Sequence, residues 1–498
     1  MVLCSMVVSK RASSFVASTR VDSDCDVSPV SHQWPFIESE VRRILGSCHI
    51  FSSGSEVVLC DSKVTKWLRV LSTLHSRMGR MSAGNQIMVC GSGDIAACEM
   101  IKAIDEAVER VLMEVYIFDD SRLAARFVTA LVNASRRGCR VTLVVDYVGS
   151  FKFPSLYLNE LTKYGVEVLT FNPVTDRNLA VGTFPFRNHK KVLIVDNRIA
   201  FCGSMNISAD STTPMMGGNG NFYDVNIRAC GPVVCDFVDI FKRTLEMTDY
   251  DISNIRCTPA TPIEGGVIVQ VLESDVSRIR RRTGIQSYLS TLISNAENNI
   301  YLTTSYFYPP GFLRRCLMDA IKRNLSIHML LSGNSDIPGD VNATMHVLRK
   351  FFKRISEQTL HKFKVFMTTQ EHCHGKYMIV DDLWSSVGSF NWDRWSSRRN
   401  LEVSVSVFDP ITALQLKSLQ QKKEKKSIEY TKQDCLNRPI MLKCFDALIH
   451  KLIRFSSRNC FDGLSSAEFK AKFKKAFIRT FIDDNASQIV AISNMASV

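Results

Sequence analysis

The sequence lacks a run of about 18 consecutive apolar residues, the length at which a membrane-spanning helix is expected, so we predict no such helix. It also lacks a repeated Cys-x-x-Cys spacing, although it contains 16 cysteines. Scattered cysteines in a chain of this length indicate reduced thiols in an intracellular protein rather than a disulfide framework. The triplet His372-Cys373-His374 has no second group of ligands at zinc spacing, so the sequence predicts no metal centre there.

Acidic residues are absent from the first twenty positions, and so is the long apolar stretch of a secretory signal. The same segment contains Lys10, Arg11 and Arg20 together with five serines and one threonine. This composition is typical of a mitochondrial presequence, with a disordered terminus as the alternative. We therefore expect a mitochondrial protein associated with the inner membrane; the alternative location is the cytoplasmic face of a membrane.

The bulk composition is that of a large, basic, globular protein. A chain of 498 residues exceeds the usual size of one hydrophobic core, so two domains are expected. Hydrophobic residues make up 45% and charged residues 22%, as in ordinary folded proteins. The net charge of +13 and the pI near 9.0 indicate a polyanionic partner, either nucleic acid or an anionic membrane surface, although a solvated basic surface gives the same totals.

One polar motif occurs twice in the chain. Its members are His189, Lys191, Asp196, Gly203-Ser204 and Asn206 in the first copy, and His374, Lys376, Asp381, Gly388-Ser389 and Asn391 in the second. Each histidine is two residues from its lysine, so on a strand both side chains point to one face. The equal spacing of both copies, 185 residues apart, indicates an internal duplication of whole domains.

Helices and strands are expected to alternate before each motif. The first half has helices at 94–110, 122–137 and 156–164 and strands at 112–118, 140–146 and 166–171. The second half has helices at 286–298, 312–324 and 341–354 and strands at 300–307, 326–332 and 364–368. This order predicts an α/β fold of two duplicated domains, each a mixed β-sheet flanked by helices, related by a pseudo-twofold axis. We divide the chain into an N-terminal extension (1–85), a first domain (86–260), a second domain (261–410) and a basic helical tail (411–498).

The duplicated residues suit chemistry at a phosphodiester. Phosphoryl transfer requires a nucleophile, an acid for the leaving oxygen and positive donors around the phosphate. His189 and His374 can divide the first two roles. Lys191 and Lys376 can offset the charge of the phosphate, so no metal or other cofactor is needed. Neutral hydrogen bonds to the phosphate are expected from Ser204, Asn206, Ser389 and Asn391.

Four carboxylates accompany these residues. Asp196 and Asp381 complete the catalytic motif, but their odd spacing from the histidines turns them to the opposite face, where we expect them to hold the strand ends. A histidine nucleophile also needs an acceptor that fixes its tautomer. Asp224 and Glu402, which follow the two motif asparagines, are the candidates for orienting the histidines.

The C-terminal part of the chain is basic. The run Lys422-Lys423-Glu424-Lys425-Lys426 predicts a linker or an exposed helix end. Further on, Ser465 and Glu468 can form a capping box. Lysines then alternate with phenylalanines at four-residue intervals, namely Phe469, Phe473, Phe477 and Phe481. This pattern predicts either a terminal helix packed on the domain or a basic amphipathic helix lying on an anionic membrane.

At these residues the chain resembles the phospholipase D superfamily, whose signature His-x-Lys-x4-Asp followed by Gly-Ser-x-Asn is present twice. Within the superfamily the context is similar to that of bacterial-type cardiolipin synthases. The similar segments are Arg187-Asn188-His189-Lys190-Lys191, Tyr223-Asp224 through Gly231-Pro232, Ser305-Tyr306-Phe307 with Pro309, and Asn400-Leu401-Glu402. The resemblance implies that one motif histidine forms a phosphatidyl-histidine intermediate and the other protonates the leaving alcohol. In the family the first-motif histidine is the usual nucleophile, here His189, although the near symmetry of the halves leaves the two indistinguishable from the residues alone.

The resemblance further implies a phosphatidyltransferase that makes cardiolipin by transphosphatidylation onto phosphatidylglycerol, peripherally on an anionic membrane. Two alternatives stay open: a CDP-diacylglycerol-dependent phosphatidylserine synthase, and a phospholipase D or nuclease-type phosphodiesterase. The nuclease is disfavoured because the chain has no obvious basic-aromatic module on which bases would stack.

Overall fold

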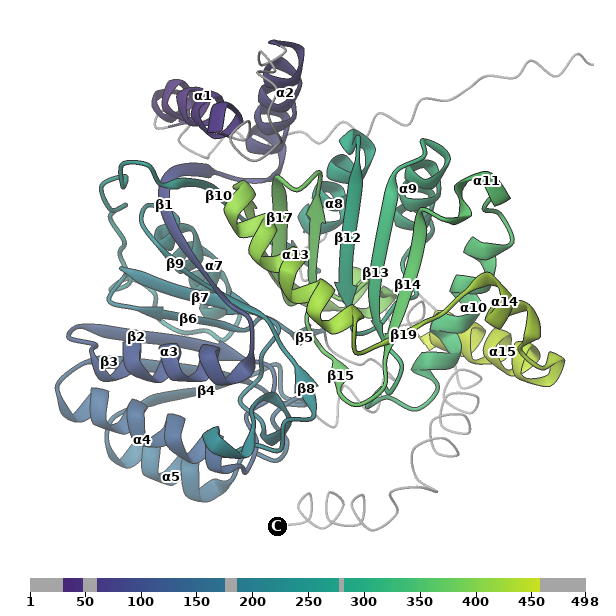
Figure 1. The fold of residues 1–498 in the computed structure, drawn as a ribbon. Helices are drawn as coiled ribbons and strands as arrows, with labels where there is room; N and C mark the ends of the chain where they lie inside the picture. The colour runs from purple at the N-terminus through teal and green to yellow at the C-terminus, as the bar shows by residue number, and fades with distance from the viewer. Residues whose placement is uncertain (1–29, 48–60, 175–185, 277–281, 457–498) are drawn as a thin grey trace, which may run out of the picture.

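The computed structural model describes residues 30–47, 61–174, 186–276 and 282–456. The presequence-like first twenty residues and the phenylalanine-rich segment after Ser465 lie outside these ranges. Figure 1 shows two halves side by side, each a sheet flanked by helices, with the first half at the lower left and the second at the right. Among the described helices, none combines the length and the hydrophobicity needed to cross a bilayer.

The first half is built on a mixed sheet. Its strands lie in the order β4 (Glu167–Phe171), β3 (Arg140–Asp146), β2 (Arg110–Val115), β6 (Val192–Val195), β7 (Ile199–Gly203), β9 (Asn226–Cys230) and β1 (Met81–Cys90). Strands β2, β3 and β4 run parallel, and the other neighbours pair antiparallel. The outer face packs on α3 (Gly93–Asp105), α4 (Arg122–Arg136) and α5 (Ser155–Lys163), and the inner face on α7 (Val234–Glu246). Strand β2 is buried along its whole length because helices cover both faces.

The second half repeats this order strand for strand. Its strands are β14 (Phe363–Thr368), β13 (Ser326–Ser332), β12 (Asn299–Thr304), β16 (Tyr377–Val380), β17 (Trp384–Gly388), β18 (Asn400–Phe408) and β10 (Val267–Asp275). Helices α8 (Gly284–Asn295), α9 (Gly311–Lys322) and α10 (Asp340–Phe352) lie outside, and α13 (Pro410–Glu424) lies inside, as α7 does in the first half. The predicted α/β duplication is therefore confirmed.

The two sheets share a strand and a core. Residues Met81–Asn85 of β1 pair with β10, and residues Gln86–Cys90 pair with β9, so β1 belongs to both sheets. Apolar side chains from the facing sides of both sheets, from α7 and from α13 form one core between the halves. Helices α1 (Val30–Ser47) and α2 (Asp61–Met78) pack on the second half. A shared strand and a shared core hold the two motifs in a defined relative position.

The remaining described elements are short, apart from the 17-residue helix Ile440–Ser456. They are β5 (Arg187–Asn188), β8 (Phe222–Tyr223), β11 (Arg282–Thr283), β15 (His372–Cys373), β19 (Ile428–Glu429), α11 (Glu357–Leu360), α12 (Arg394–Arg398), α14 (Lys432–Asn437), α15 (Ile440–Ser456) and the 3-10 turns η2 (Ala209–Ser211) and η3 (Pro214–Met216). Glycines with positive φ values, +95° at Gly138 and +82° at Gly165, follow the C-terminal ends of α4 and α5.

Two sequence predictions are corrected by the structure. Cys235 on α7 forms a disulfide with Cys257, so the prediction of reduced thiols throughout is wrong at this pair. The pairing depends on the chain after α7 folding back on that helix, which no cysteine spacing reveals. The segment from residue 411, which we assigned to a basic tail, begins with α13, whose Ala413 and Leu416 are fully buried in the core between the halves. The lysine run lies at the C-terminal end of this helix, which is the second of the two alternatives predicted for it.

Candidate active site

The backbone holds His189 against the other half of the molecule. Strand β5 pairs in parallel with the start of β18, and the His189 N–H donates to the Leu401 carbonyl over 3.0 Å. This pairing brings the next residue, Glu402, to the imidazole, whose Nδ1 lies 3.0 and 3.1 Å from the two carboxylate oxygens. A carboxylate at Nδ1 favours the tautomer that leaves Nε2 free for chemistry.

His374 has the equivalent environment with the halves exchanged. Strand β15 pairs in parallel with β8, and the His374 N–H donates to the Tyr223 carbonyl over 3.0 Å. The next residue, Asp224, places Oδ1 2.7 Å from Nδ1 of His374. Each histidine thus hydrogen-bonds a carboxylate from the other half, an exchange that the order of residues along the chain does not reveal.

Each glycine-serine pair supports one of these carboxylates. Ser204 Oγ donates to Asp224 over 2.6 Å, and Ser389 Oγ donates to Glu402 over 2.5 Å. The preceding glycines allow the close strand approach: a Cβ on Gly203 would lie 2.4 Å from the Val225 carbonyl oxygen. The one hydroxyl proton of each serine is therefore directed to a carboxylate, which differs from the phosphate-donor role predicted for Ser204 and Ser389.

The two motif lysines lie buried beside their histidines. Lys191 Nζ donates to the His189 carbonyl over 2.8 Å, and Lys376 Nζ donates to the His374 carbonyl over 2.5 Å and to Ser305 Oγ over 3.0 Å. Burial lowers the pKa of Lys191 to about 7 and that of Lys376 to about 8; Lys376 lowers the pKa of Lys191 further, while Glu402 and Asp224 raise both values. A bound anion would stabilise the charged form of both lysines, so this buried pair is suited to contact a phosphate.

The histidines are neutral bases at neutral pH, and their carboxylates are ionised. Burial lowers the pKa of each imidazole to about 4; Lys191 and Lys376 act in the same direction and the carboxylates oppose it. Burial raises the pKa of Asp224, but His374 and Lys376 outweigh it and the value falls to about 2. The pKa of Glu402 is likewise below its ordinary value, because His189 and Lys191 outweigh burial.

The motif asparagines differ from each other. Asn206 Oδ1 accepts the backbone N–H of Ile117 over 3.2 Å. The buried Oδ1 of Asn391 accepts no hydrogen bond from any part of the chain that the structure describes. A buried amide oxygen without a donor is a candidate for binding a hydroxyl or a water at the site.

The motif aspartates lie at strand turns and bind backbone. Asp196, which has a φ of +52°, accepts the N–H groups of Val108, Glu109 and Arg110 over 2.8–3.0 Å. Asp381, with a φ of +54°, accepts those of residues 297–299 over 2.7–3.1 Å. Each carboxylate ties its hairpin to the chain entering the first parallel strand, and the structure shows neither in contact with a motif histidine.

Aromatic rings that the sequence patterns did not single out pack on the histidines. The Tyr116 ring lies edge-on to His189 with centroids 4.9 Å apart, and Phe222 stacks on His374 with centroids 4.8 Å apart. Phe222 directly precedes Tyr223-Asp224, and Tyr116 directly follows β2, inside the strand predicted over 112–118. Chain position alone did not distinguish them from core residues.

The chain is related in sequence to known proteins. The family described as "Cardiolipin synthase, PLD-like domain" matches residues 100–221 and 289–423, a little over half of the chain. The chain belongs to this family. Cardiolipin synthase B of Salmonella typhimurium is 26% identical over 338 residues, covering 66% of this chain and 77% of the relative. Cardiolipin synthase of Geobacillus sp. is 24% identical over 411 residues, covering 80% and 78%.

A solved structure agrees in fold. The phosphatidylserine synthase of Haemophilus influenzae superimposes with a TM-score of 0.60 at 14% identity, over 78% of this chain and 96% of that one. The two family matches lie in the two halves, and both motifs are retained. The chain is therefore an enzyme of the phospholipase D superfamily, a phosphatidyltransferase.

Proposed function

We propose that the chain makes cardiolipin by transferring a phosphatidyl group onto a hydroxyl of phosphatidylglycerol. The observation that carries this proposal is the pair of histidine–carboxylate contacts exchanged between the halves, with one buried lysine beside each histidine. Nε2 of His189 attacks the phosphorus of the donor lipid, and His374 protonates the departing alcohol. His374 then removes the proton from the acceptor hydroxyl, which displaces His189 and releases the product.

Binding of the phosphate supplies the proton that this mechanism needs. His374 is neutral in the free site because burial and Lys376 lower its pKa to about 4. The negative charge of a bound phosphodiester next to the imidazole favours the protonated form and raises the pKa. The general acid is then charged when substrate is present.

The remaining motif residues have supporting roles in this mechanism. Lys191 and Lys376 offset the charge on the phosphate oxygens. Asn206 and Asn391 each lie at the same end of their half as the histidine of that half. Ser204 and Ser389 hold the carboxylates that orient the histidines. Asp196 and Asp381 act on stability through the turns that they tie down.

Lipid products from purified protein test the proposal. Phosphatidylglycerol alone, or with phosphatidylethanolamine or CDP-diacylglycerol as donor, should give cardiolipin. Variants His189→Ala and His374→Ala should give none. Release of phosphatidic acid without cardiolipin would contradict the proposal, and phosphatidylserine formed from CDP-diacylglycerol and serine would favour the alternative synthase. Cleavage of single-stranded DNA by wild type but not by His374→Ala would favour the nuclease.

We also propose a mitochondrial address and peripheral binding to an anionic membrane. Lys10, Arg11 and Arg20 in an acid-free segment support the address, and the net charge of +13 supports binding to anionic lipids. Import of the full chain into isolated mitochondria, with a shortened N-terminus afterwards, tests the address. Retention outside the organelle would contradict it.

A further inference from the structure

Helix α15 turns a continuous row of apolar side chains outward. Its inward face packs on α10 and includes Asp446 and His450, which are 1% and 8% exposed. The outward row, here called the α15 stripe, consists of Met441, Phe445, Leu448, Leu452 and Phe455, each between 45% and 80% exposed. Its spacing of three and four residues places all five side chains on one helix face. An apolar face of this length on a surface helix marks an interaction site.

Basic side chains outnumber exposed acids around the α15 stripe. Asp340 on α10 and Asp446 on α15 are both buried, and Asp446 pairs with Arg438 over 2.7 Å. The exposed Asp319 of α9 and Glu357 of α11 pair with Lys322 and Lys432. The nearby cations are Arg314 on α9, Lys350 on α10, Arg354 just after α10, and Lys451 and Arg454 on α15. Burial and the neighbouring cations lower the pKa of Arg314 and of Lys350, so these charges are close enough to repel one another. A hollow at the start of α15 adds Arg349, Lys353, Lys432 and Lys443.

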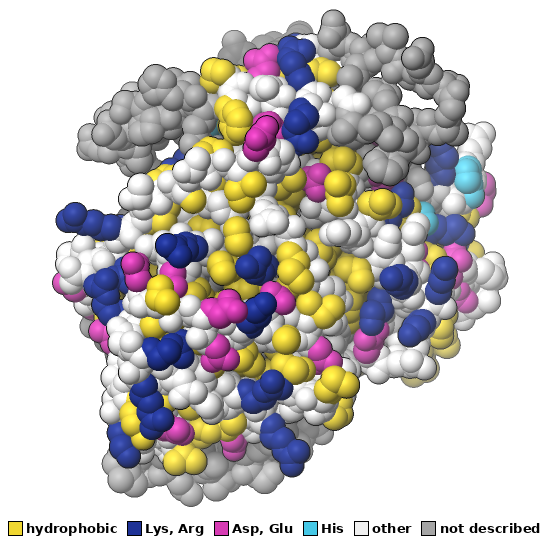
Figure 2. Space-filling model, turned by 60° about the vertical axis from the view of Figure 1, so that its left-hand side comes forward, with side chains coloured by type: hydrophobic (Ala, Val, Ile, Leu, Met, Phe, Trp, Pro, Cys, Tyr) yellow, Lys and Arg dark blue, Asp and Glu magenta, His cyan; other side chains and the backbone are white. Residues whose placement is uncertain are grey.

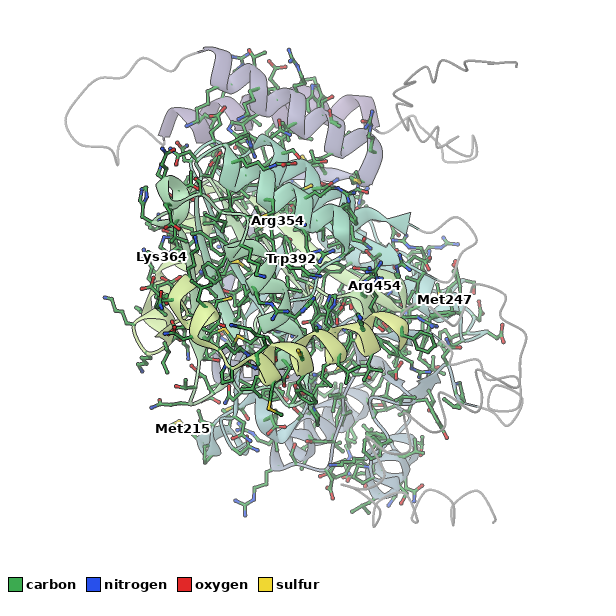
Figure 3. All side chains as sticks on the ribbon, turned by 90° about the vertical axis from the view of Figure 1, so that its right-hand side faces the viewer. Met215, Met247, Arg354, Lys364, Trp392 and Arg454 are labelled. Carbon is green, nitrogen blue, oxygen red and sulfur yellow. A yellow bond between two sulfur atoms is a disulfide. The ribbon has the colours of Figure 1, made fainter. Side chains whose placement is uncertain are left out.

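The α15 stripe lies on the same end of the second half as the motif residues. His450 stacks on His346 with centroids 4.6 Å apart, and its pKa is lowered by burial and by cations that include Arg394, three residues after Asn391. In the view of Figure 3, which looks onto α15, Trp392 lies between Arg354 and Arg454. The face in Figure 2 is different, because acidic and basic side chains are interspersed there.

We propose that the α15 stripe and its flanking cations dock the enzyme on a bilayer that contains anionic phospholipid. The inference rests on the proposed function, which requires a lipid substrate at the nearby site. Charge complementarity selects the membrane over two other occupants. A second copy on this face would bring cations against cations, which is unfavourable. The chain's own residues beyond 456 contain six cations and four acids, so their net charge of +2 would also add to the positive charge of this face. A bilayer receives the apolar row in its acyl boundary and the cations among its phosphates.

Flotation of the full-length protein with vesicles tests this surface. Vesicles of phosphatidylcholine with phosphatidylglycerol should bind wild type, and phosphatidylcholine alone should bind it several-fold more weakly. Leu448→Ser with Leu452→Ser should weaken binding at least about tenfold, because each exposed leucine loses an apolar contact with lipid. Leu156→Ser, at a 70% exposed leucine on α5, is the apolar control, and Arg354→Glu is compared with Lys102→Glu on α3 as the charge control.

Two further measurements distinguish the possible failures. Cardiolipin formation from short-chain, detergent-dispersed phosphatidylglycerol should be unchanged in the leucine variant. If wild type forms no cardiolipin in this assay, the proposed function is contradicted, and the vesicle experiment still tests the docking surface. Unchanged vesicle binding by the leucine variant would overturn the docking surface. A shift of that variant from dimer to monomer by light scattering, with vesicle binding retained, would instead assign the α15 stripe to contact between copies.

Discussion

Replacing Glu402 with glutamine separates the roles of the two histidines. Glu402 is fully buried, and it accepts from Ser389 Oγ and from Asn400 Nδ2 in addition to contacting His189. Glutamine keeps the shape and one acceptor oxygen, and its amide can donate to Ser389, so the protein should fold. What disappears is the negative charge 3.0 Å from Nδ1 of His189.

The size of the effect follows from that lost charge. A hydrogen bond to a charged group contributes about 1.5–3 kcal/mol. At about 1.36 kcal/mol per factor of ten, kcat should fall about 10- to 150-fold. Because Glu402 raises the pKa of His189, its removal also lowers that pKa further and makes the imidazole a poorer base and nucleophile.

The choice of leaving group shows which step is slowed. A phosphatidyl ester of nitrophenol releases a stable anion that needs no proton, whereas phosphatidylglycerol releases an alcohol that does. If His189 is the nucleophile, Glu402→Gln should slow both substrates. The matched variant Asp224→Asn acts on His374, so it should slow the first turnover of the alcohol substrate but not the initial release of nitrophenol, which comes before the step in which His374 serves as base.

Trapping of the covalent intermediate tests independently which histidine is the nucleophile. With the nitrophenyl ester as donor, a covalent phosphatidyl-enzyme should be absent in His189→Ala and should accumulate in His374→Ala, which lacks the base that activates the alcohol acceptor. The opposite pattern in both experiments would show that His374 is the nucleophile. Equal losses with both substrates in both carboxylate variants would refute the division of roles altogether.

Three other predictions concern charge and stability. Lys191 has a pKa of about 7, so it is charged below that pH and neutral above it, and KM for the phospholipid should rise between about pH 7 and 9. In Lys191→Arg this rise of KM should move to higher pH. The same dependence of KM on pH in the variant and in wild type would contradict the reasoning. Asp381→Asn should lower the free energy of unfolding by about 1–3 kcal/mol in urea, because the backbone N–H groups of residues 297–299 lose a charged acceptor, while kcat stays within about twofold; a large loss of kcat in a stable protein would give Asp381 a role in catalysis. Replacing Cys235 and Cys257 with serine should lower the unfolding free energy by about 3 kcal/mol for a loop of 22 residues, compared with wild type under oxidising conditions, and no change would mean that the bridge contributes little.

The sequence predicts the repeated framework well because the relevant signals are local. Strands β3 and β13 have the predicted bounds, and the helices around them begin and end within a few residues of the predicted positions. Apolar continuity over Arg140–Asp146 and glycine at residues 138 and 165 are short-range features that tertiary packing did not override. Helix α13 was missed as a packed helix because its lysine run dominates its composition, while its buried side chains are few.

The site was predicted by residue type but not by partner. The repeated spacing identified both histidines, and a period of two placed each lysine on the same face as its histidine. The candidate carboxylates were chosen because they follow the two motif asparagines along the chain. Which carboxylate contacts which histidine depends on the pairing of β5 with β18 and of β15 with β8, and these short strands join opposite halves. The serines were misread for the same reason: their carboxylate partners are 20 and 13 residues away in sequence and come into reach only through the sheet.

Exchange of carboxylates between the halves makes the site a property of the interface between them. Lys190, between the two site residues, points the other way and is fully buried; it donates to Thr244 over 2.6 Å and to Glu273 of the second half over 3.2 Å. The same three-residue segment therefore supplies a histidine to the site and a buried cation to the contact between the halves. A change at that contact would move His189 relative to Glu402 without altering either residue. Because the motif in one half is incomplete without the carboxylate of the other, neither half can orient its own histidine, and a duplication in which each half serves the other must retain both copies.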